Sequence, residues 1–388
     1  MRRTPAAVLV AALLFAMLTP LPSFAQTAAT ITLSASAGKI VFGQSVTISG
    51  TLAPASGGEA IELLDGSGAL VATASAGTSG AFSASIEPER TDAYVAATAD
   101  ATSQPVTVRV RAVTTVTMSP VRLFDAVTVR GTVSPARPGR RVEVTLTKAG
   151  RTIATRRVEM GPAGRFVAEL EIPAPGTYRA RARFTGDDLL PGTAVSDADR
   201  TPLPRLSEGD DGVYVELLEA RLVALHYRLA ATSDGEYDFR TADAVVAFHK
   251  VQRMARSFVA SAATWRRLAD PRTPQPRNDW RGLHIEVDQT LQVLYTVEDG
   301  EITNVLHVST GAGGATRDGS FRVYRKLAGF SPNHLYYPSY FDGLRALHGW
   351  TEVPTYNASH GCVRIPYWNA QWVFGLAVYG TRVVIYHS

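Results

Sequence analysis

The chain has 388 residues, of which 45% are hydrophobic and 19% are charged. This composition excludes wholesale disorder, and the length predicts two or three domains, or more if some are small β-sandwiches. The formal net charge of +4 falls to +2 without Arg2 and Arg3, so the chain lacks the strongly basic character of nucleic-acid-binding proteins.

Residues 1–25 have the pattern of a cleavable signal peptide. Two arginines precede an apolar run at 6–18, and Ser-Phe-Ala at 23–25 has the small-x-small pattern of a signal-peptidase site. The apolar run is short for a membrane span of about 20 residues. We therefore expect cleavage near Gln26 and an exported, extracytoplasmic protein of the cell wall or periplasm. An uncleaved membrane anchor is the alternative.

An internal repeat follows this leader. Two stretches carry it at a constant offset of 81 residues: Val46-x-Ile48-x-Gly50-x-Leu52 and Val127-x-Val129-x-Gly131-x-Val133. Apolar residues alternate over short runs that Gly, Pro and Asp interrupt, which predicts many short strands. We therefore expect two consecutive β-sandwiches, at 29–111 and 112–201. They resemble the immunoglobulin-like modules of exported bacterial proteins, and we expect them to act as spacers.

Basic residues are concentrated in the second of these modules. From Ala112 to Pro204 there are fourteen Lys and Arg against nine Asp and Glu. Six of the arginines lie close together in the chain: Arg137, Arg140, Arg141, Arg151, Arg156 and Arg157. A solvated surface is the preferred interpretation, and weak attraction to an anionic wall polymer is the alternative.

Helical periodicity begins after the linker Thr201-Pro-Leu-Pro204. Apolar residues recur at helical spacing in two runs, and a third short helix is expected around Trp265 and Leu268. The two runs are Val215, Leu218, Leu222, Leu225 and then Ala244, Val245, Phe248, Val251, the second with Thr241 as the expected N-cap.

This segment, 205–270, resembles the three-helix peptidoglycan-binding module. It departs from that family at His226, where a glycine usually precedes the tyrosine, and at His249, where a glutamine usually follows the phenylalanine. We expect both histidines to be ordinary helix residues. The resemblance predicts the fold, with binding to glycan as a weaker expectation.

Strand patterns return beyond Trp280. Apolar residues alternate from Leu283 to Val297, and Asp299-Gly300 is a strong hairpin signal leading into a strand at 302–308. A helix is expected at 368–377 and a last strand at 381–386. Residues 280–388 are therefore expected to form a β-rich domain.

Cys362 is the only cysteine of the chain. An unpaired cysteine in an exported protein is either a partner for another chain or a reactive thiol, and the polar, glycine-flanked setting favours reactivity over an inert buried side chain. His348 and His360 lie upstream within fourteen positions, and an imidazole can accept a thiol proton. A zinc site made of these three residues is not expected, because the paired spacing of structural zinc motifs and a fourth ligand are missing.

The segment Ser359-His360-Gly361-Cys362-Val363-Arg364 resembles the signature of the L,D-transpeptidases, the YkuD-type catalytic domain. Upstream pieces agree in order: Asp288-x-x-Leu291-Gln292, Ser309-Thr310-Gly311, Asp318-Gly319-x-Phe321 and Leu347-His348-Gly349. The interval from His348 to Ser359 is shorter than in many members, and Arg364 replaces the asparagine of the commonest pattern. The resemblance covers 280–388. Together with the upstream modules it predicts a multidomain chain of two all-β Ig-like sandwiches, a small three-helix domain and a β-rich catalytic domain.

The resemblance implies a ping-pong acyl transfer on peptidoglycan stem peptides. Cys362 would attack the carbonyl at the L-centre of diaminopimelate and expel D-Ala, and an amine of a second stem would take the acyl group to give a 3→3 cross-link. His348 would be the general base, with its ring oriented by a carbonyl near Gly349. Gly361 would allow main-chain N–H groups of residues 360–362 to form an oxyanion hole.

Other residues of the motif would shape the substrate site. His360 and Ser359 would hydrogen-bond within it, and Arg364 would hold a substrate carboxylate or brace the loop. Tyr337 and Tyr340 would line the donor cleft, with strand packing an equally weighted alternative. No cofactor or metal is implied, acylation by a carbapenem is expected, and nothing in the sequence demands more than a monomer.

Two other functions stay open at this point. Water could take the acyl group in place of an amine, which would make the protein an L,D-carboxypeptidase that trims tetrapeptide stems. The chain could instead be a cell-wall-binding protein that keeps the fold without catalysis. The intact Cys–His pair favours an enzyme of peptidoglycan biosynthesis, cell wall organization and cell shape.

Overall fold

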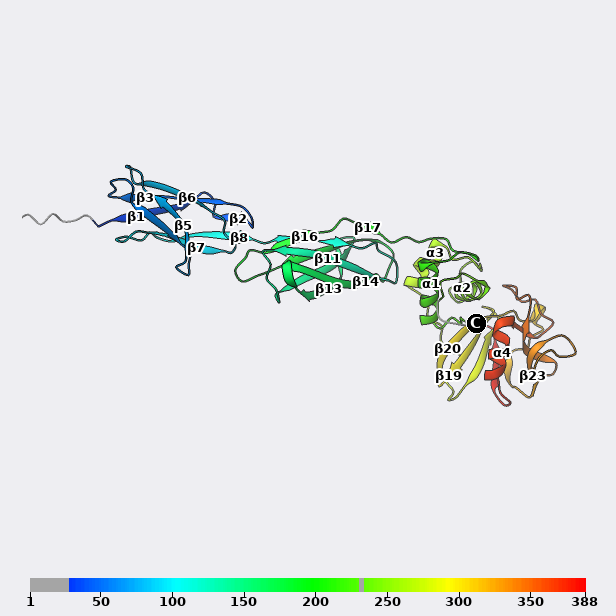
Figure 1. The fold of residues 1–388 in the computed structure, drawn as a ribbon. Coiled ribbons are helices and arrows are strands. Elements are labelled where there is room, and N and C mark those ends of the chain that lie inside the picture. The colour runs from blue at the N-terminus through cyan, green and yellow to red at the C-terminus, as the bar shows by residue number, and fades with distance from the viewer. Residues whose placement is uncertain (1–27, 230–233) are drawn as a thin grey trace, which may run out of the picture. The chain divides into compact units, whose positions relative to one another are not determined.

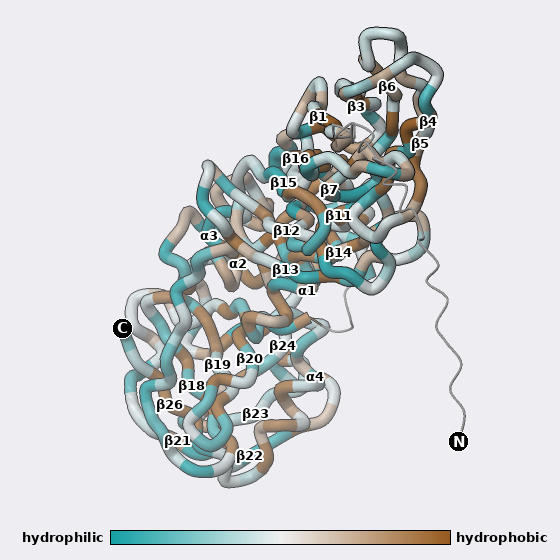
Figure 2. Tube along the Cα trace, turned by 90° about the vertical axis from the view of Figure 1, so that its left-hand side faces the viewer, coloured by the Kyte–Doolittle hydropathy of each residue, from teal (hydrophilic) through white to brown (hydrophobic). Residues whose placement is uncertain are grey.

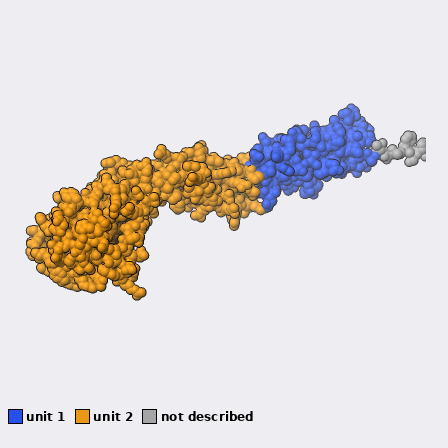
Figure 3. Space-filling view, turned by 180° about the vertical axis from the view of Figure 1, so that it is seen from behind, with its two compact units in different colours: residues 1–112, 186–190 blue, residues 113–185, 191–388 orange. Residues whose placement is uncertain are grey.

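The computed structural model describes residues 28–229 and 234–388, so the predicted signal peptide lies outside the described residues. The chain divides into two compact units, 1–112 with 186–190 and 113–185 with 191–388 (Figure 3). Within the described ranges no helix is long and apolar enough to cross a membrane.

The first β module has two sheets (Figure 1). One sheet has the order β1-β3-β6 and the other β2-β8-β7-β4-β5. The strands are β1 Thr30–Ala35, β2 Lys39–Val41, β3 Val46–Ala53, β4 Ala60–Leu64, β5 Leu70–Ser75, β6 Ala81–Ile86, β7 Asp92–Ala97 and β8 Val106–Arg111. Buried and more exposed residues alternate along β3, β4 and β8, as expected of sheets with one face in a core. Figure 2 shows the hydropathy of the residues along the chain.

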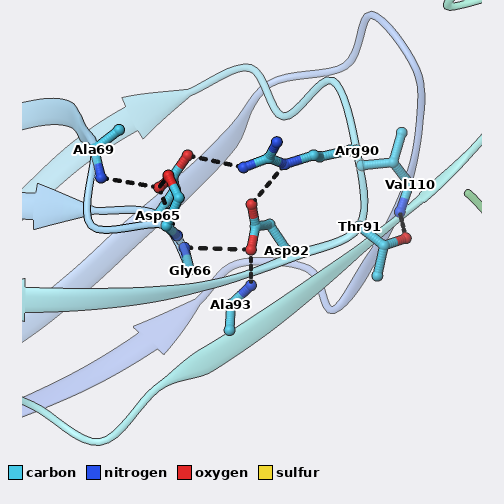
Figure 4. Close-up of polar contacts among 9 residues, drawn as sticks. Asp65, Gly66, Ala69, Arg90, Thr91, Asp92, Ala93 and Val110 are labelled. Atoms are coloured by element: carbon cyan, nitrogen blue, oxygen red, sulfur yellow. Dashed lines mark hydrogen bonds and ion pairs between the residues drawn. The ribbon is translucent and has the colours of Figure 1, made fainter. Parts of the chain in front are cut away.

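A polar cluster ties the start of β7 to the turn after β4 (Figure 4). Arg90 donates from Nε to Asp92 Oδ2 at 2.8 Å and from Nη2 to Asp65 Oδ2 at 3.1 Å. Asp65 also accepts from Ser67 and Ala69, and these hydrogen bonds, the Ser67 hydroxyl first, lower the pKa of its carboxyl. Because the Arg90 side chain is 48% exposed, we expect the ion pairs to fix the turn without adding much stability.

The second β module also has two sheets, of order β10-β11-β14, with β9 on β11, and β13-β12-β15-β16, with β17 on β15. Its strands are β9 Val113–Thr114, β10 Thr117–Met118, β11 Ala126–Ser134, β12 Arg141–Lys148, β13 Arg151–Glu159, β14 Arg165–Glu171, β15 Thr177–Phe184, β16 Gly192–Val195 and β17 Asp199–Arg200; η1 Pro162–Gly164 is a single 3₁₀ turn.

The internal repeat is confirmed by equivalent glycines in β3 and β11. A Cβ at Gly50 would lie 2.0 Å from Thr32 O and 2.6 Å from the Phe82 ring. At Gly131 the corresponding distances are 2.1 Å to Thr115 O and 2.4 Å to the Phe166 ring. In each module a phenylalanine ring therefore lies on a strand position that only glycine can occupy, which explains why this part of the pattern recurs.

Three helices follow: α1 Val213–Ala224, α2 Phe239–Val251 and α3 Ala262–Ala269. The predicted N-cap of α2 at Thr241 is wrong, because Asp238 accepts the main-chain N–H groups of Arg240 and Thr241. The prediction that His226 is a helix residue is also wrong. His226 follows α1 with a φ of 66°, a left-handed conformation that explains the glycine usual at this position.

The C-terminal part contains two further sheets. Their orders are β20-β19-β18-β26-β21 and β22-β23-β24-β25. The elements are β18 His284–Asp288, β19 Val293–Glu298, β20 Glu301–His307, η2 Ala312–Gly314, β21 Gly319–Arg322, β22 Arg325–Lys326, β23 Tyr336–Asp342, β24 Arg345–Trp350, β25 Val363–Pro366, α4 Tyr367–Leu376 and β26 Arg382–Tyr386. The predicted hairpin at Asp299-Gly300 is confirmed, with φ values of 50° and 85° at its two turn residues.

The sheet containing β19 is buried on both faces. Val293, Tyr295 and Val297 join the core formed by the helices, with Leu218 and Phe248 among its members. Leu294, on the opposite face of the same strand, joins the core that the two C-terminal sheets and α4 share. The helices therefore cover one face of this sheet, while the catalytic motif lies on the sheet beyond the other face.

Candidate active site

Cys362 immediately precedes β25, and its side chain is partly buried. β25 runs parallel to β24, with Leu347 beside Val363 and His348 beside Arg364. This register brings the thiol and the imidazole to neighbouring strands. The sulfur lies 3.7 Å from Leu344 O, and no hydrogen bond joins Cys362 to His348 in this described part of the chain.

His348 is buried on β24, where only 2% of its surface is exposed. Its Nδ1 lies 2.9 Å from Gly349 O, and because a carbonyl can only accept, Nδ1 carries the proton. The Nε2 atom is then an unprotonated acceptor, and no described residue hydrogen-bonds to it. Burial lowers the pKa of His348 to about 4, so the ring is neutral at neutral pH.

Gly349 is required by the packing around this histidine. A Cβ at this position would lie 2.6 Å from the Ala370 side chain on α4 and 3.0 Å from Tyr336. Close contact with α4 therefore fixes the strand that carries both the imidazole and the carbonyl that orients it.

The electrostatic setting of Cys362 keeps the thiol protonated at rest. Burial raises the pKa of the thiol, while the Ala346 N–H and the Arg345 and Arg364 guanidinium groups act in the opposite direction. At rest the thiol and the imidazole are accordingly both neutral, so any attack by the sulfur would have to be coupled to loss of its proton.

Arg345, which the sequence did not single out, lies against the turn that carries the thiol. Its Nε donates to Ala315 O at 2.7 Å and its Nη1 to Asp342 Oδ2 at 3.0 Å. A Cβ on Gly361 would lie 3.1 Å from Arg345 Nε. The sequence shows only that a basic residue lies three positions before His348. Nothing in the sequence spacing predicts that this residue contacts Gly361.

A short hydrogen-bond network shapes the turn before Cys362. Ser359 Oγ donates to Cys362 O and accepts the Gly361 N–H at 3.0 Å. Thr316 Oγ1, which the sequence also did not identify, donates to Gly361 O at 2.8 Å. Because Ser359 already accepts the Gly361 N–H, the predicted oxyanion hole would have to use the N–H groups of His360 and Cys362.

The segment after β20 holds this turn from the other side. Ser309 and Arg364 exchange main-chain hydrogen bonds of 3.0 and 2.8 Å. Thr310 O accepts the N–H of Ser359 at 3.0 Å, and Ala312 donates to Ser359 O at 2.8 Å. The turn that carries Cys362 is therefore held both by β25 and by the segment that follows β20.

The remaining predicted site residues occupy different environments. His360 is exposed, and no described residue hydrogen-bonds to its ring. The Arg364 guanidinium lies 5.3 Å from the centre of the Trp350 ring. The Tyr337 ring packs 5.1 Å from Phe374 on α4, and Tyr340 is buried, with 5% of its surface exposed.

Helix α2 reaches the same region through Lys250. This side chain is 1% exposed, and its Nζ donates to Gln292 O at 2.8 Å, to Val308 O at 3.0 Å and to His307 Nδ1. The three acceptors match the three N–H groups of a charged ammonium. Burial opposes the charged forms, because it lowers the pKa of both Lys250 and His307. His307 Nε2 in turn donates to Val353 O at 2.8 Å, in the loop between His348 and Cys362.

Two further contacts join the helices to the catalytic region. Arg256 donates to Thr355 O at 2.6 Å and to Thr290 O at 2.8 Å. Trp368 Nε1 on α4 donates to Asp243 Oδ2 at 2.8 Å, and burial raises the pKa of that carboxyl to about 6. Arg256, in the loop between α2 and α3, thus holds Thr355, and Asp243 of α2 holds one end of α4.

The C-terminal part of the chain is similar to proteins of a known family. Residues 282–385 match the family model of YkuD, the L,D-transpeptidase catalytic domain. Among solved structures, the L,D-transpeptidase of Xylanimonas cellulosilytica (residues 123–326) is 33% identical, over 48% of this chain and 100% of that one, with a TM-score of 0.45. That of Stackebrandtia nassauensis is 25% identical, over 48% and 98%, with a TM-score of 0.31.

The catalytic domain of the E. faecium L,D-transpeptidase is 22% identical over 28% of this chain and 100% of that one, with a TM-score of 0.25. No curated protein matches the chain. Across the described ranges, no group of three or more His, Cys, Asp and Glu side chains is placed to hold a metal ion. The family match includes β24, β25 and the turn that carries Cys362, and residues 282–385 are therefore a YkuD-type L,D-transpeptidase catalytic domain.

Proposed function

We propose that this protein is a secreted peptidoglycan L,D-transpeptidase that forms 3→3 cross-links by ping-pong acyl transfer through Cys362. The observation that carries the proposal is that Cys362 directly precedes the strand beside His348, whose Nδ1 proton is committed to Gly349 O. That commitment leaves Nε2 as the atom that can accept the thiol proton. The family match of residues 282–385 supports the reaction class.

In the first half-reaction, Cys362 Sγ attacks the carbonyl carbon at the L-centre of the donor stem. The thiol proton passes to His348 Nε2, and His348 then delivers it to the departing amine of D-Ala, which leaves a thioester on the enzyme. Before attack the sulfur has to turn from Leu344 O, 3.7 Å away, towards His348. The N–H groups of His360 and Cys362 are the candidates for stabilising the oxyanion, since Gly361 N–H is bound to Ser359.

In the second half-reaction, a side-chain amine of an acceptor stem attacks the thioester carbonyl. His348 Nε2 takes a proton from the amine, and collapse of the tetrahedral intermediate releases the sulfur, which regains the proton. We assign the binding of a stem carboxylate to the Arg364 guanidinium, which forms no hydrogen bond with a described residue and whose charge acts on the thiol.

The test is incubation of the purified protein with a disaccharide-tetrapeptide, beside Cys362→Ala, followed by liquid chromatography and mass spectrometry. A dimer lacking one D-Ala, present only with the unmodified protein, is the expected product. Tripeptide monomer alone would mean that water is the acceptor and that the protein is an L,D-carboxypeptidase. An unchanged substrate in both samples would favour a wall-binding protein.

A carbapenem supplies an independent readout of the same thiol. The strained lactam carbonyl should acylate Cys362 and add the mass of one intact drug to the protein, while Cys362→Ala should stay unmodified. Failure to form this adduct would count against Cys362 as a nucleophile even if a cross-linked product were seen.

A further inference from the structure

Five arginines of β12, β13 and β15 share the outer face of one sheet in the second β module, and Arg200 of β17 lies at the end of the same face. Strand register places them on the same side: Glu143 pairs with both Arg157 and Arg183, and Thr145 and Thr147 pair with Arg181 and Arg179. Arg141 lies two positions before Glu143 and thus on the same face. We call this set the arginine face: Arg141, Arg157, Arg179, Arg181 and Arg183.

The arginine face keeps most of its charge available to a ligand. All five residues are exposed, and in the described part of the chain only Arg157 forms an ion pair, with Glu143 at 3.1 Å. Arg141, Glu143, Arg157 and Arg183 surround a depression of about 310 Å³. Glu143 and Glu159 are the acidic residues on these strands that share the face, so its formal charge is +5 − 2 = +3.

The first β module provides an internal comparison. There Glu62 pairs with Ala97 and Leu64 with Val95, just as Glu143 pairs with Arg183 and Thr145 with Arg181. The sequence at 29–111 contains four basic and seven acidic residues, whereas 112–204 contains fourteen and nine. The two modules therefore have equivalent strands, but only the second carries arginines at these paired positions. The shared fold does not require these arginines.

The spacing of the arginines suits a linear polymer. Alternate residues of β15 lie roughly 6.6 Å apart and neighbouring strands about 4.8 Å apart, so Arg179, Arg181 and Arg183 form a straight row with Arg141 and Arg157 beside it. The five charged groups are all guanidinium, whose planar set of donors matches the oxygens of a phosphate. The strands present Thr145, Thr147 and Thr155 between the arginines and no aromatic ring on which a nucleobase could stack.

We propose that the arginine face binds a linear polyol-phosphate polymer, in which phosphodiesters recur along a chain without bases. Each phosphate would accept hydrogen bonds from one or two guanidinium groups, and the hydroxyl groups of the polyol would meet the threonines. The site is separate from Cys362 and does not depend on the proposed transpeptidase activity.

The test measures binding of the full chain to poly(glycerol phosphate) as a function of salt. The probing variant replaces Arg179, Arg181 and Arg183 by glutamine, and the control replaces Arg130 and Arg165, exposed arginines on the other sheet of the same module. We expect the triple variant to bind at least about tenfold more weakly at low salt, with a shallower dependence of log K on log salt. The control should stay within about twofold.

Two further measurements make each outcome decisive. A triple Arg→Lys variant keeps the charge: if it binds fully, charge alone suffices and the guanidinium argument is overturned. Polyglutamate and oligothymidylate of equal charge are the competitor polymers, and equal binding of either would overturn the choice of polyol phosphate. Unaltered binding by the glutamine variant, with unchanged thermal unfolding, would overturn the site itself.

Discussion

Two buried histidines of this protein make similar contacts and serve different purposes. His348 donates from Nδ1 to Gly349 O at 2.9 Å, and His307 donates from Nε2 to Val353 O at 2.8 Å. Burial lowers the pKa of both. The difference is the second nitrogen: that of His307 accepts from Lys250, while that of His348 accepts from no described residue.

The comparison teaches that burial and a lowered pKa do not by themselves identify a catalytic histidine. A ring with both nitrogens committed can only hold neighbouring groups in place, whereas a ring with one open acceptor can take a proton. The open nitrogen lies on the strand beside Cys362, and the committed one lies between a helix and a loop. The following predictions test this division.

The largest effect is expected from His348→Gln. Glutamine keeps a donor for Gly349 O but supplies no base, so the rate of D-Ala release should fall about 10²–10⁴-fold with little change in thermal stability. His307→Gln is the matched control and should mainly lower the melting temperature. Equal loss of activity in both variants, at a temperature where both are folded, would contradict the assignment of proton transfer to His348 alone.

Lys250→Met is expected to be next in size, and to act on stability. It leaves Gln292 O, Val308 O and His307 Nδ1 without their buried donor, which should lower the free energy of unfolding by about 2–4 kcal/mol. Urea unfolding, with the exposed Lys39→Met as control, measures the difference. A stability equal to that of the unmodified protein would mean that the buried amine contributes nothing to this contact.

The pH dependence of activity should show the lowered pKa of His348. Only the neutral ring can accept the thiol proton, so kcat/KM should fall as the pH drops through about 4 rather than through the usual histidine range near 6.5. An acid limb near 6.5 would contradict the burial argument.

Stability should depend on pH in the same window. Between about 4 and about 6.5 the unfolded chain binds the proton that folded His348 excludes, so His348 makes stability rise with pH there. Asp243 acts oppositely, because its raised pKa of about 6 makes its contribution decline as the pH rises through that value. Asp243→Asn should therefore steepen the rise measured by calorimetry between pH 4 and 6.

The smallest effect is expected from His360→Ala. This histidine is exposed and its ring forms no hydrogen bond with a described residue. It therefore neither stabilises the turn nor is held in position to accept a proton. Turnover of the tetrapeptide should change by less than about threefold. A loss comparable with that of His348→Gln would show that substrate binding recruits the ring and that the resting contacts are a poor guide.

The sequence predicted the local features of the site. Cys362 stood out as an unpaired thiol, and the order of His348 and Gly349 before it matched a known signature. The Asp299-Gly300 hairpin and the helix at 368–377 also follow from local residue preferences, and the structure contains both, the helix as α4 at Tyr367–Leu376.

Residues that act through distant partners could not be predicted in this way. Lys250 reads as a polar helix residue, and its buried position depends on carbonyl groups more than forty residues away. Thr316 and Arg345 contact the Gly361 turn although they lie far from it in the sequence. The periodicity of apolar residues predicts helices and strands but not such contacts. Thr241 precedes an apolar run, which predicts an N-cap, but it lies buried inside α2 and donates to Glu219.

The number of residues between His307 and Gly311 is fixed by contacts at both ends of this segment. His307 at the first position meets Lys250, Ser309 pairs with Arg364, and Gly311 pairs with Ser359, so both ends are anchored to different partners. One inserted or deleted residue would send alternate side chains to the opposite face and separate the two anchors. The effects of substitutions here can be graded, whereas one extra residue would disconnect the helices from the turn that carries Cys362 in a single step.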